Sequence, residues 1–173
     1  MASSGTVLPG LPLKISQNQI LPFSSCQFIG LTQFSEQSRI SPTSTYNNIV
    51  HQNPVKQFTH LINEMNKMPL SYIHIMNIPF PADKFPQYPA NSIEEFGKLT
   101  QHTIIANCGY NKETGEAELE KGIAKLISYG ALFLANPDLP KRFERNAALN
   151  EADRATMYGG KDQGYIDYPF LED

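Results

Sequence analysis

Two glycines stand where a chain of alternating strands and helices tends to place its chemistry. Gly109 comes shortly after the apolar run "IIAN", and Gly130 comes shortly after the apolar run "LIS". In a β/α barrel the turns after the last strands point backbone N–H groups inward, where they can bind a phosphate. A glycine after a strand also serves plain turn geometry, and the spacing leaves both interpretations open.

The charged candidate is Arg39, at the end of the first predicted strand and just before Ser41 and Pro42. A guanidinium at a strand end can neutralise an anionic or electron-rich edge of a ligand, and the alternative is an ordinary surface arginine. Residues 127–143, "ISYGALFLANPDLPKRF", predict a buried strand with a ligand-facing turn at its end. That turn carries Ala131, which has neither a charge nor a hydrogen-bonding side chain.

The overall composition predicts a single globular domain. The chain has 173 residues, of which 40% are hydrophobic and 18% are charged, so it can bury a core. The net charge of -3 gives no basic excess that would favour nucleic acid or an anionic membrane. No apolar run approaches the roughly 18 to 20 residues of a membrane span.

The cysteines and histidines predict neither a disulfide framework nor a metal site. Cys26 and Cys108 form no CxxC pair, which predicts a reducing compartment and a cytoplasmic location. His74 lies in an apolar run and is interpreted as a core or pocket histidine. No metal-ligand spacing occurs among the four histidines, which are His51, His60, His74 and His102.

Residues 1–38 predict an irregular N-terminal arm. The first 35 residues contain one charged side chain, Lys14, and neither a helical nor a strand period persists in them. Their Ser-rich, acid-free composition is also typical of an organelle transit peptide. Organelle targeting through residues 1–35 is therefore the alternative to a cytoplasmic location.

From residue 39 onward, short apolar runs alternate with amphipathic segments. Strands are predicted to begin near residues 38, 70, 103 and 126, with a helix after each. Asn53 can cap the first helix, Ser92 the second and Thr114 the third. Four β/α units in a row predict a parallel sheet. It is either an open four-stranded sheet or half of a closed barrel, which takes about 250 residues in full.

Several motifs then occur in one order and at close spacing: "RISP…YNN", "YIHIM", "ANCGYNKETGEAE", "YGALFLANPDLPKRF" and "GYIDYP". Together they resemble the C-terminal half of the old yellow enzyme family, over residues 39–173. These are flavin-dependent ene-reductases that include the plant 12-oxophytodienoate reductases. The resemblance implies an α/β fold made of strands five to eight of a TIM (β/α)8 barrel, with FMN at the strand ends.

The resemblance also implies roles for individual residues. Arg39 matches the arginine beside the flavin pyrimidine edge, and Gly109 matches the glycine after strand seven that contacts the FMN phosphate. Gly130 and Ala131 match the strand-eight Gly-Arg pair that holds the same phosphate. Tyr46 and Tyr165 match aromatic residues that line the substrate pocket, although tyrosines of a tail such as "GYIDYP" can also simply pack onto the body.

The sequence departs from the family pattern at several of these positions. Ala131 replaces the family's arginine, Lys125 replaces an acid before strand eight, and Cys108 stands where glycine is frequent. "NIPF" stands after strand six, where an acid and an arginine are usual. No counterpart of strands one to four is found, and residues 1–38 hold no histidine or tyrosine for the family's substrate-anchoring and proton-donating roles. No catalytic residue is therefore assigned.

Two functions of different classes follow from this resemblance. The first is an FMN-dependent ene-reductase that passes a hydride from NAD(P)H through the flavin to a small activated alkene. The second is a truncated, non-catalytic relative that associates with itself or with another chain through its open barrel edges. The missing half and Ala131 favour the second for this chain acting alone.

Overall fold

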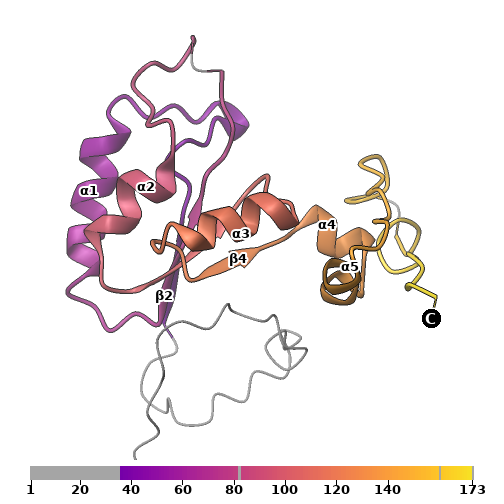
Figure 1. The fold of residues 1–173 in the computed structure, drawn as a ribbon. Coiled ribbons are helices and arrows are strands. Elements are labelled where there is room, and N and C mark those ends of the chain that lie inside the picture. The colour runs from indigo at the N-terminus through magenta and orange to yellow at the C-terminus, as the bar shows by residue number, and fades with distance from the viewer. Residues whose placement is uncertain (1–35, 82, 160, 173) are drawn as a thin grey trace, which may run out of the picture.

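The computed structural model describes residues 36–81, 83–159 and 161–172, and its centre is a four-stranded parallel sheet. The strands lie in the order β1-β2-β3-β4 (Figure 1). This confirms the predicted parallel sheet, and the strands start within two residues of the predicted positions. Their bounds are Gln37–Ile40 (β1), Tyr72–Met76 (β2), Thr103–Asn107 (β3) and Leu126–Ser128 (β4).

The predicted arm falls almost entirely outside the described residues. Gln37 and Ser38, however, belong to β1 and pair with Tyr72 and Ile73 of β2. The predicted boundary between residues 38 and 39 therefore cuts through the first strand. The sequence signal for the start of this strand is weak, because only Ile40 of its four residues is buried.

Three helices cover one face of the sheet and bury the core against it. They are α1 (Pro54–Met65), α2 (Ser92–Phe96), which continues as the 3-10 turn η3 (Gly97–Leu99), and α3 (Lys112–Glu120). Alternate residues of β2 and β3 point toward these helices and are fully or almost fully buried, as is Ile40 of β1. The core cluster includes Ile73, Ile75, Ile104 and Ala106 from the strands and Ile62, Met65, Ile93 and Phe96 from the helices.

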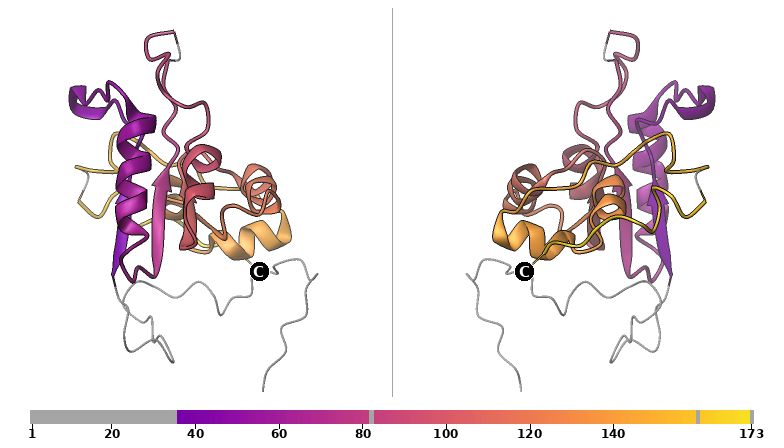
Figure 2. Two further views of the ribbon diagram at one scale, coloured as in Figure 1. Left: turned by 90° about the vertical axis from the view of Figure 1, so that its left-hand side faces the viewer. Right: turned by 90° about the vertical axis from the view of Figure 1, so that its right-hand side faces the viewer.

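The opposite face of the sheet is not covered by these helices. The strand register places Arg39, His74, Ile105 and Leu126 in one row on that face. Arg39 is exposed and Leu126 is 52% exposed. The buried residues of the strands, in contrast, all lie on the face that the helices cover. Figures 1 and 2 show α1 and α2 on one side of β2 and the C-terminal segment, residues 146–159 and 161–172, on the other.

Two of the three predicted helix caps are wrong by one or three residues. The Asn53 side chain caps α1 as predicted, by accepting from the amide of Lys56 at 3.1 Å. Asn91, and not Ser92, caps α2 by accepting from the amides of Ile93 and Glu94. Helix α3 begins at Lys112 because Asn111 and Thr114 form a reciprocal capping box.

The apolar run "ALFLA" is a helix and not part of a strand or turn. Strand β4 ends at Ser128, and residues Ala131–Ala135 form the one-turn helix α4. Gly130 is its N-terminal capping residue, so Ala131 is the first helical residue. A second short helix, α5 (Leu139–Arg145), follows directly, with Pro140 in its first turn. The predicted ligand-facing turn is therefore confined to Tyr129 and Gly130.

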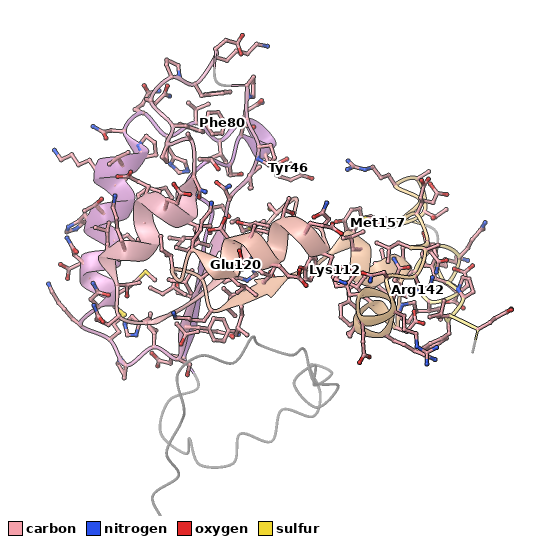
Figure 3. All side chains as sticks on the ribbon, in the orientation of Figure 1. Tyr46, Phe80, Lys112, Glu120, Arg142 and Met157 are labelled. Atoms are coloured by element: carbon pink, nitrogen blue, oxygen red, sulfur yellow. The ribbon has the colours of Figure 1, made fainter. Side chains whose placement is uncertain are left out.

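Buried polar contacts fasten the C-terminal segment to α5. Arg142 is 5% exposed, and its guanidinium donates to the carboxylate of Asp138 at 2.7 Å. The same group donates to the carbonyls of Ala148 at 2.6 Å and Pro169 at 2.9 Å. Figure 3 shows Arg142 enclosed between α5 and the tail. Within the described ranges, no helix is long and apolar enough to cross a membrane.

Candidate functional site

The structure brings Gly109 and Gly130 to the same edge of the sheet. Asn107, the last residue of β3, pairs with Ser128, the last residue of β4, so the turns that follow these strands are neighbours. Both glycines are exposed, and a methyl group added at either would meet no atom within 4 Å. Two exposed backbone turns at the carboxyl ends of adjacent parallel strands can direct N–H groups at one anion.

The turn after β3 holds an unusual backbone conformation. Cys108 has a φ of 84° and Gly109 has a φ of 77°. Glycine adopts this region freely, whereas a cysteine there carries strain on the order of 1 to 3 kcal/mol. The turn thus keeps two consecutive left-handed residues although only one of them is glycine. This geometry explains why the resemblance leads one to expect glycine at position 108.

A chain of hydrogen bonds crosses the strand ends and joins the two turns. The Asn107 amide donates to the carbonyl of Ser128 at 2.9 Å and to its hydroxyl at 2.7 Å. The Ser128 hydroxyl is in turn 2.9 Å from Nε2 of His74, and the Cys108 thiol donates to Oδ1 of Asn107. Sequence reasoning missed Asn107 and Ser128, although Asn107 is the polar last residue of the predicted strand "TIIAN" and Ser128 is a polar residue inside the predicted strand "LISYG".

Arg39 lies beside this chain, and its positive charge affects the neighbouring groups. The register places it opposite His74 on β2. Burial lowers the pKa of His74, and the charge of Arg39 lowers this pKa further. The imidazole is therefore neutral at pH 7, and the Arg39 guanidinium has no second cation next to it there. His74, interpreted from the sequence as a core or pocket histidine, lies half-buried on the uncovered sheet face, with its Nε2 2.9 Å from the Ser128 hydroxyl.

Cys108 is not activated as a nucleophile. Burial raises the pKa of its thiol, and the charge of Arg39 only partly opposes this effect. A protonated thiol that donates a hydrogen bond to Asn107 is a structural group, because the thiolate is the reactive form. No cluster of three or more His, Cys, Asp or Glu side chains that could hold a metal ion occurs within the described ranges.

Tyr46 and Tyr165 lie outside this group of contacts. Tyr46 begins the 3-10 turn η2 (Tyr46–Asn48) after β1 and is 76% exposed. Tyr165 is 55% exposed in the C-terminal segment. Figure 3 shows Tyr46 projecting toward the side of the molecule that carries that segment. No hydrogen bond or ring contact among the described residues joins either phenol to Arg39 or to the glycine turns.

The loop that carries Tyr46 is held in place by the long loop after β2. The Thr43 hydroxyl donates to the carbonyl of Ile78 at 2.9 Å, and the backbone amide of His51 donates to the Tyr88 hydroxyl at 3.0 Å. Tyr88 also packs edge-on against Phe80, with ring centroids 5.1 Å apart. The exposed Tyr46 side chain therefore stands on a loop with a fixed base.

Ala131 leaves the glycine edge without a cationic side chain of its own, and two cations near α4 and α5 have structural partners instead. Lys112, at the start of α3, donates to the carbonyl of Phe143 and to the side chain of Asn146 at the end of α5. Arg142 is enclosed by its three acceptors in the C-terminal segment. Both side chains are labelled in Figure 3. Among these groups, an anion at Gly109 and Gly130 could be met by backbone N–H groups alone.

The arrangement fits the terminal phosphate and pyrimidine edge of a flavin nucleotide. The two exposed glycine turns can donate N–H groups to the phosphate, and an exposed guanidinium on the uncovered sheet face can meet an electron-rich ring edge. The model of the NADH:flavin oxidoreductase / NADH oxidase family matches residues 30–150.

Individual relatives give the same picture. A 12-oxophytodienoate reductase-like protein of Solanum lycopersicum is 44% identical over 116 residues, which are 66% of this chain and 30% of that protein. The 12-oxophytodienoate reductase 1 of Oryza sativa subsp. japonica is 38% identical over 137 residues, which are 78% of this chain and 36% of that protein.

Solved structures show the same fold. The structure of morphinone reductase in complex with tetrahydroNAD is 31% identical, with a TM-score of 0.68 over 79% of this chain and 36% of that one. The old yellow enzyme from Trypanosoma cruzi gives a TM-score of 0.71 at 26% identity, over 79% of this chain and 35% of that one. The chain thus spans about a third of the length of these relatives, as a part of their barrel. It belongs to the NADH:flavin oxidoreductase / NADH oxidase family.

Proposed function

We propose that this chain supplies the FMN-holding part of an old yellow enzyme-type site. The observation that carries the proposal is the pairing of two exposed glycine turns at the ends of β3 and β4 with Arg39 on the uncovered sheet face. Backbone N–H groups at Gly109 and Gly130 donate to the FMN phosphate, and Arg39 meets the pyrimidine edge. Bound FMN supplies hydride transfer from NAD(P)H to an activated alkene.

Each residue of this chain has a distinct task in the proposed site. The cross-strand bonds of Asn107 hold the two phosphate turns in register. Arg39 places the single fixed positive charge, because the neighbouring His74 is kept neutral by burial and by Arg39 itself. A guanidinium stabilises the anionic form of the reduced ring more than the neutral oxidised form. Tyr46 and Tyr165 border the pocket for a small activated alkene.

The free strand edges support the second candidate, in which this chain does not act alone. Within the described residues, the outer edges of β1 and β4 have no strand partner. Unpaired edges and the exposed Leu126 favour association with a second copy or with another chain that continues the barrel. The proposed location is the cytoplasm, with organelle targeting through residues 1–35 as the alternative.

Flavin titration tests the proposed site directly. Arg39→Ala is expected to weaken the binding of both FMN and riboflavin by about 10- to 100-fold, since both ligands share the ring edge and a charged hydrogen bond is worth about 1.5 to 3 kcal/mol. Quenching of flavin fluorescence measures both dissociation constants. Arg154→Ala, an exposed arginine of the C-terminal segment, is the matched control and should change neither value. If Arg39→Ala bound each flavin as tightly as the wild-type chain does, the proposal would be contradicted.

Turnover by the isolated chain tests whether it needs a partner chain for activity. With FMN, NADPH and 2-cyclohexenone under anaerobic conditions, we expect no more cyclohexanone than free FMN produces. Protonation of the substrate needs an acid within hydrogen-bond reach of the reacting carbon. The two tyrosines assigned to the pocket make no contact with the glycine turns or Arg39. Product well above the free-FMN control, and lost in Arg39→Ala, would show that this chain is an ene-reductase by itself.

A further inference from the structure

Tyr129 makes a second side-chain connection between the segments that follow β3 and β4, beyond the Asn107 bonds at the strand ends. It lies directly before Gly130, and its hydroxyl donates to the carbonyl of Asn111 at 3.3 Å. Asn111 is two residues after Gly109 and caps α3. The Tyr129 ring also packs edge-on against Phe143 of α5, with ring centroids 5.3 Å apart and an interplanar angle of 76°. One phenol thus contacts the segments that follow both strands.

Helix α3 leaves room for this phenol by carrying a glycine in its interior. A methyl group at Gly115 would lie 2.3 Å from the Tyr129 hydroxyl oxygen and 3.4 Å from the ring carbon that bears it. The first distance is far inside van der Waals contact, so any larger residue at position 115 displaces the ring. Glycine weakens a helix interior relative to alanine. The position therefore favours the tyrosine contact over the local stability of the helix.

We propose that Tyr129 is a positioning residue for the phosphate of FMN. By joining the turn before Gly130 to the start of α3, it sets the distance between the N–H groups of the two glycine turns. Donors that are held in place before the ligand arrives bind it more tightly than donors that must be ordered on binding. The Asn107 bonds act at the strand ends, whereas Tyr129 acts one turn further out, next to the phosphate. This inference rests on the proposed FMN site.

A double-mutant cycle at positions 115 and 129 tests the proposal, because a methyl group at position 115 would meet the hydroxyl oxygen of Tyr129. Tyr129→Phe removes the hydroxyl and is expected to weaken FMN binding by roughly two- to tenfold, the range for one ordinary hydrogen bond. Gly115→Ala should weaken FMN binding at least as much, since its methyl group turns the whole ring away. The double variant should bind FMN as Tyr129→Phe does, because phenylalanine lacks the oxygen that the methyl group meets.

Three further measurements make the result specific. Riboflavin has no phosphate, so its dissociation constant should stay unchanged in all three variants. Glu120→Ala, at the exposed last position of α3, is the matched control and should leave FMN binding unchanged. Thermal unfolding without flavin should show the same non-additivity between positions 115 and 129, and additive effects there would overturn the contact itself.

The outcomes distinguish this inference from the proposed function. FMN binding that is unchanged in Tyr129→Phe and Gly115→Ala would overturn the positioning role while the proposed site stands. Equal weakening of FMN and riboflavin would also overturn it, because a general loss of structure explains that pattern. If the wild-type chain binds FMN no better than riboflavin, the phosphate site itself is wrong and the positioning role fails with it.

Discussion

Ala131→Arg is expected to tighten FMN binding by about 10- to 100-fold. Ala131 is the exposed first residue of α4 and directly follows Gly130, so a new side chain there enters solvent and displaces no packed group. A guanidinium can bind a phosphate with two parallel hydrogen bonds. Charged hydrogen bonds contribute about 1.5 to 3 kcal/mol, which corresponds to the stated range. Flavin fluorescence titration of both proteins at one salt concentration measures the change.

Matched substitutions at the same position identify the cause of the gain. Ala131→Lys adds the charge without the planar fork and should tighten FMN binding less than arginine does. Ala131→Gln adds length without charge and should have little effect. Riboflavin binding should not change in any of these variants. An FMN affinity that is the same in wild type and Ala131→Arg would place the phosphate away from Gly130 and contradict the proposed site.

Arg142→Ala is expected to lower the free energy of unfolding by about 3 to 5 kcal/mol, the usual cost of removing one partner of a buried ion pair. The substitution leaves the buried Asp138 carboxylate without its guanidinium and leaves the carbonyls of Ala148 and Pro169 without their donor. Urea denaturation measures the loss. Hydrogen exchange should also show early opening at Leu171, whose amide donates to Asp138.

The exposed Arg154 again provides the control, since Arg154→Ala should change the free energy of unfolding by less than about 0.5 kcal/mol. If Arg142→Ala were as stable as Arg154→Ala, the C-terminal segment would not depend on the buried guanidinium. The proposal would then lose its account of how the segment that carries Tyr165 is held.

The ion pair between Asp138 and Arg142 also makes the free energy of unfolding depend on pH in the acid range. Burial of the Asp138 carboxyl acts to raise its pKa, but hydrogen bonds from Arg142 and from the backbone, with the charge of Arg142, outweigh it and lower the pKa overall. A lowered folded-state pKa contributes stability above the ordinary carboxyl range near 4, and this contribution is lost as the pH falls through the folded value. In Arg142→Ala the guanidinium no longer lowers the folded-state pKa of Asp138, so this acid-dependent loss of stability should become smaller.

Local sequence signals determined the β/α alternation and the family. Short apolar strands and the Asn53 cap depend on residues a few positions apart, so they can be predicted without knowledge of the tertiary structure. The helix starts at Asn91 and Asn111 were harder to place, because several side chains in each loop can cap and packing selects one of them. "ALFLA" has the composition of a strand, but β4 stops at Ser128 and the next turn becomes a helix.

The contacts that build the candidate site were decided by tertiary structure alone. No feature of the neighbouring sequence indicates that Gly115 leaves room for the hydroxyl of Tyr129, or that Arg39 affects the pKa of Cys108. These groups are 14 and 69 positions apart in the sequence and meet only through the register of the parallel strands. Sequence determined which residues follow each strand, because that is a property of chain order. The sheet decided which of them are neighbours, because parallel pairing brings distant strand ends to one edge.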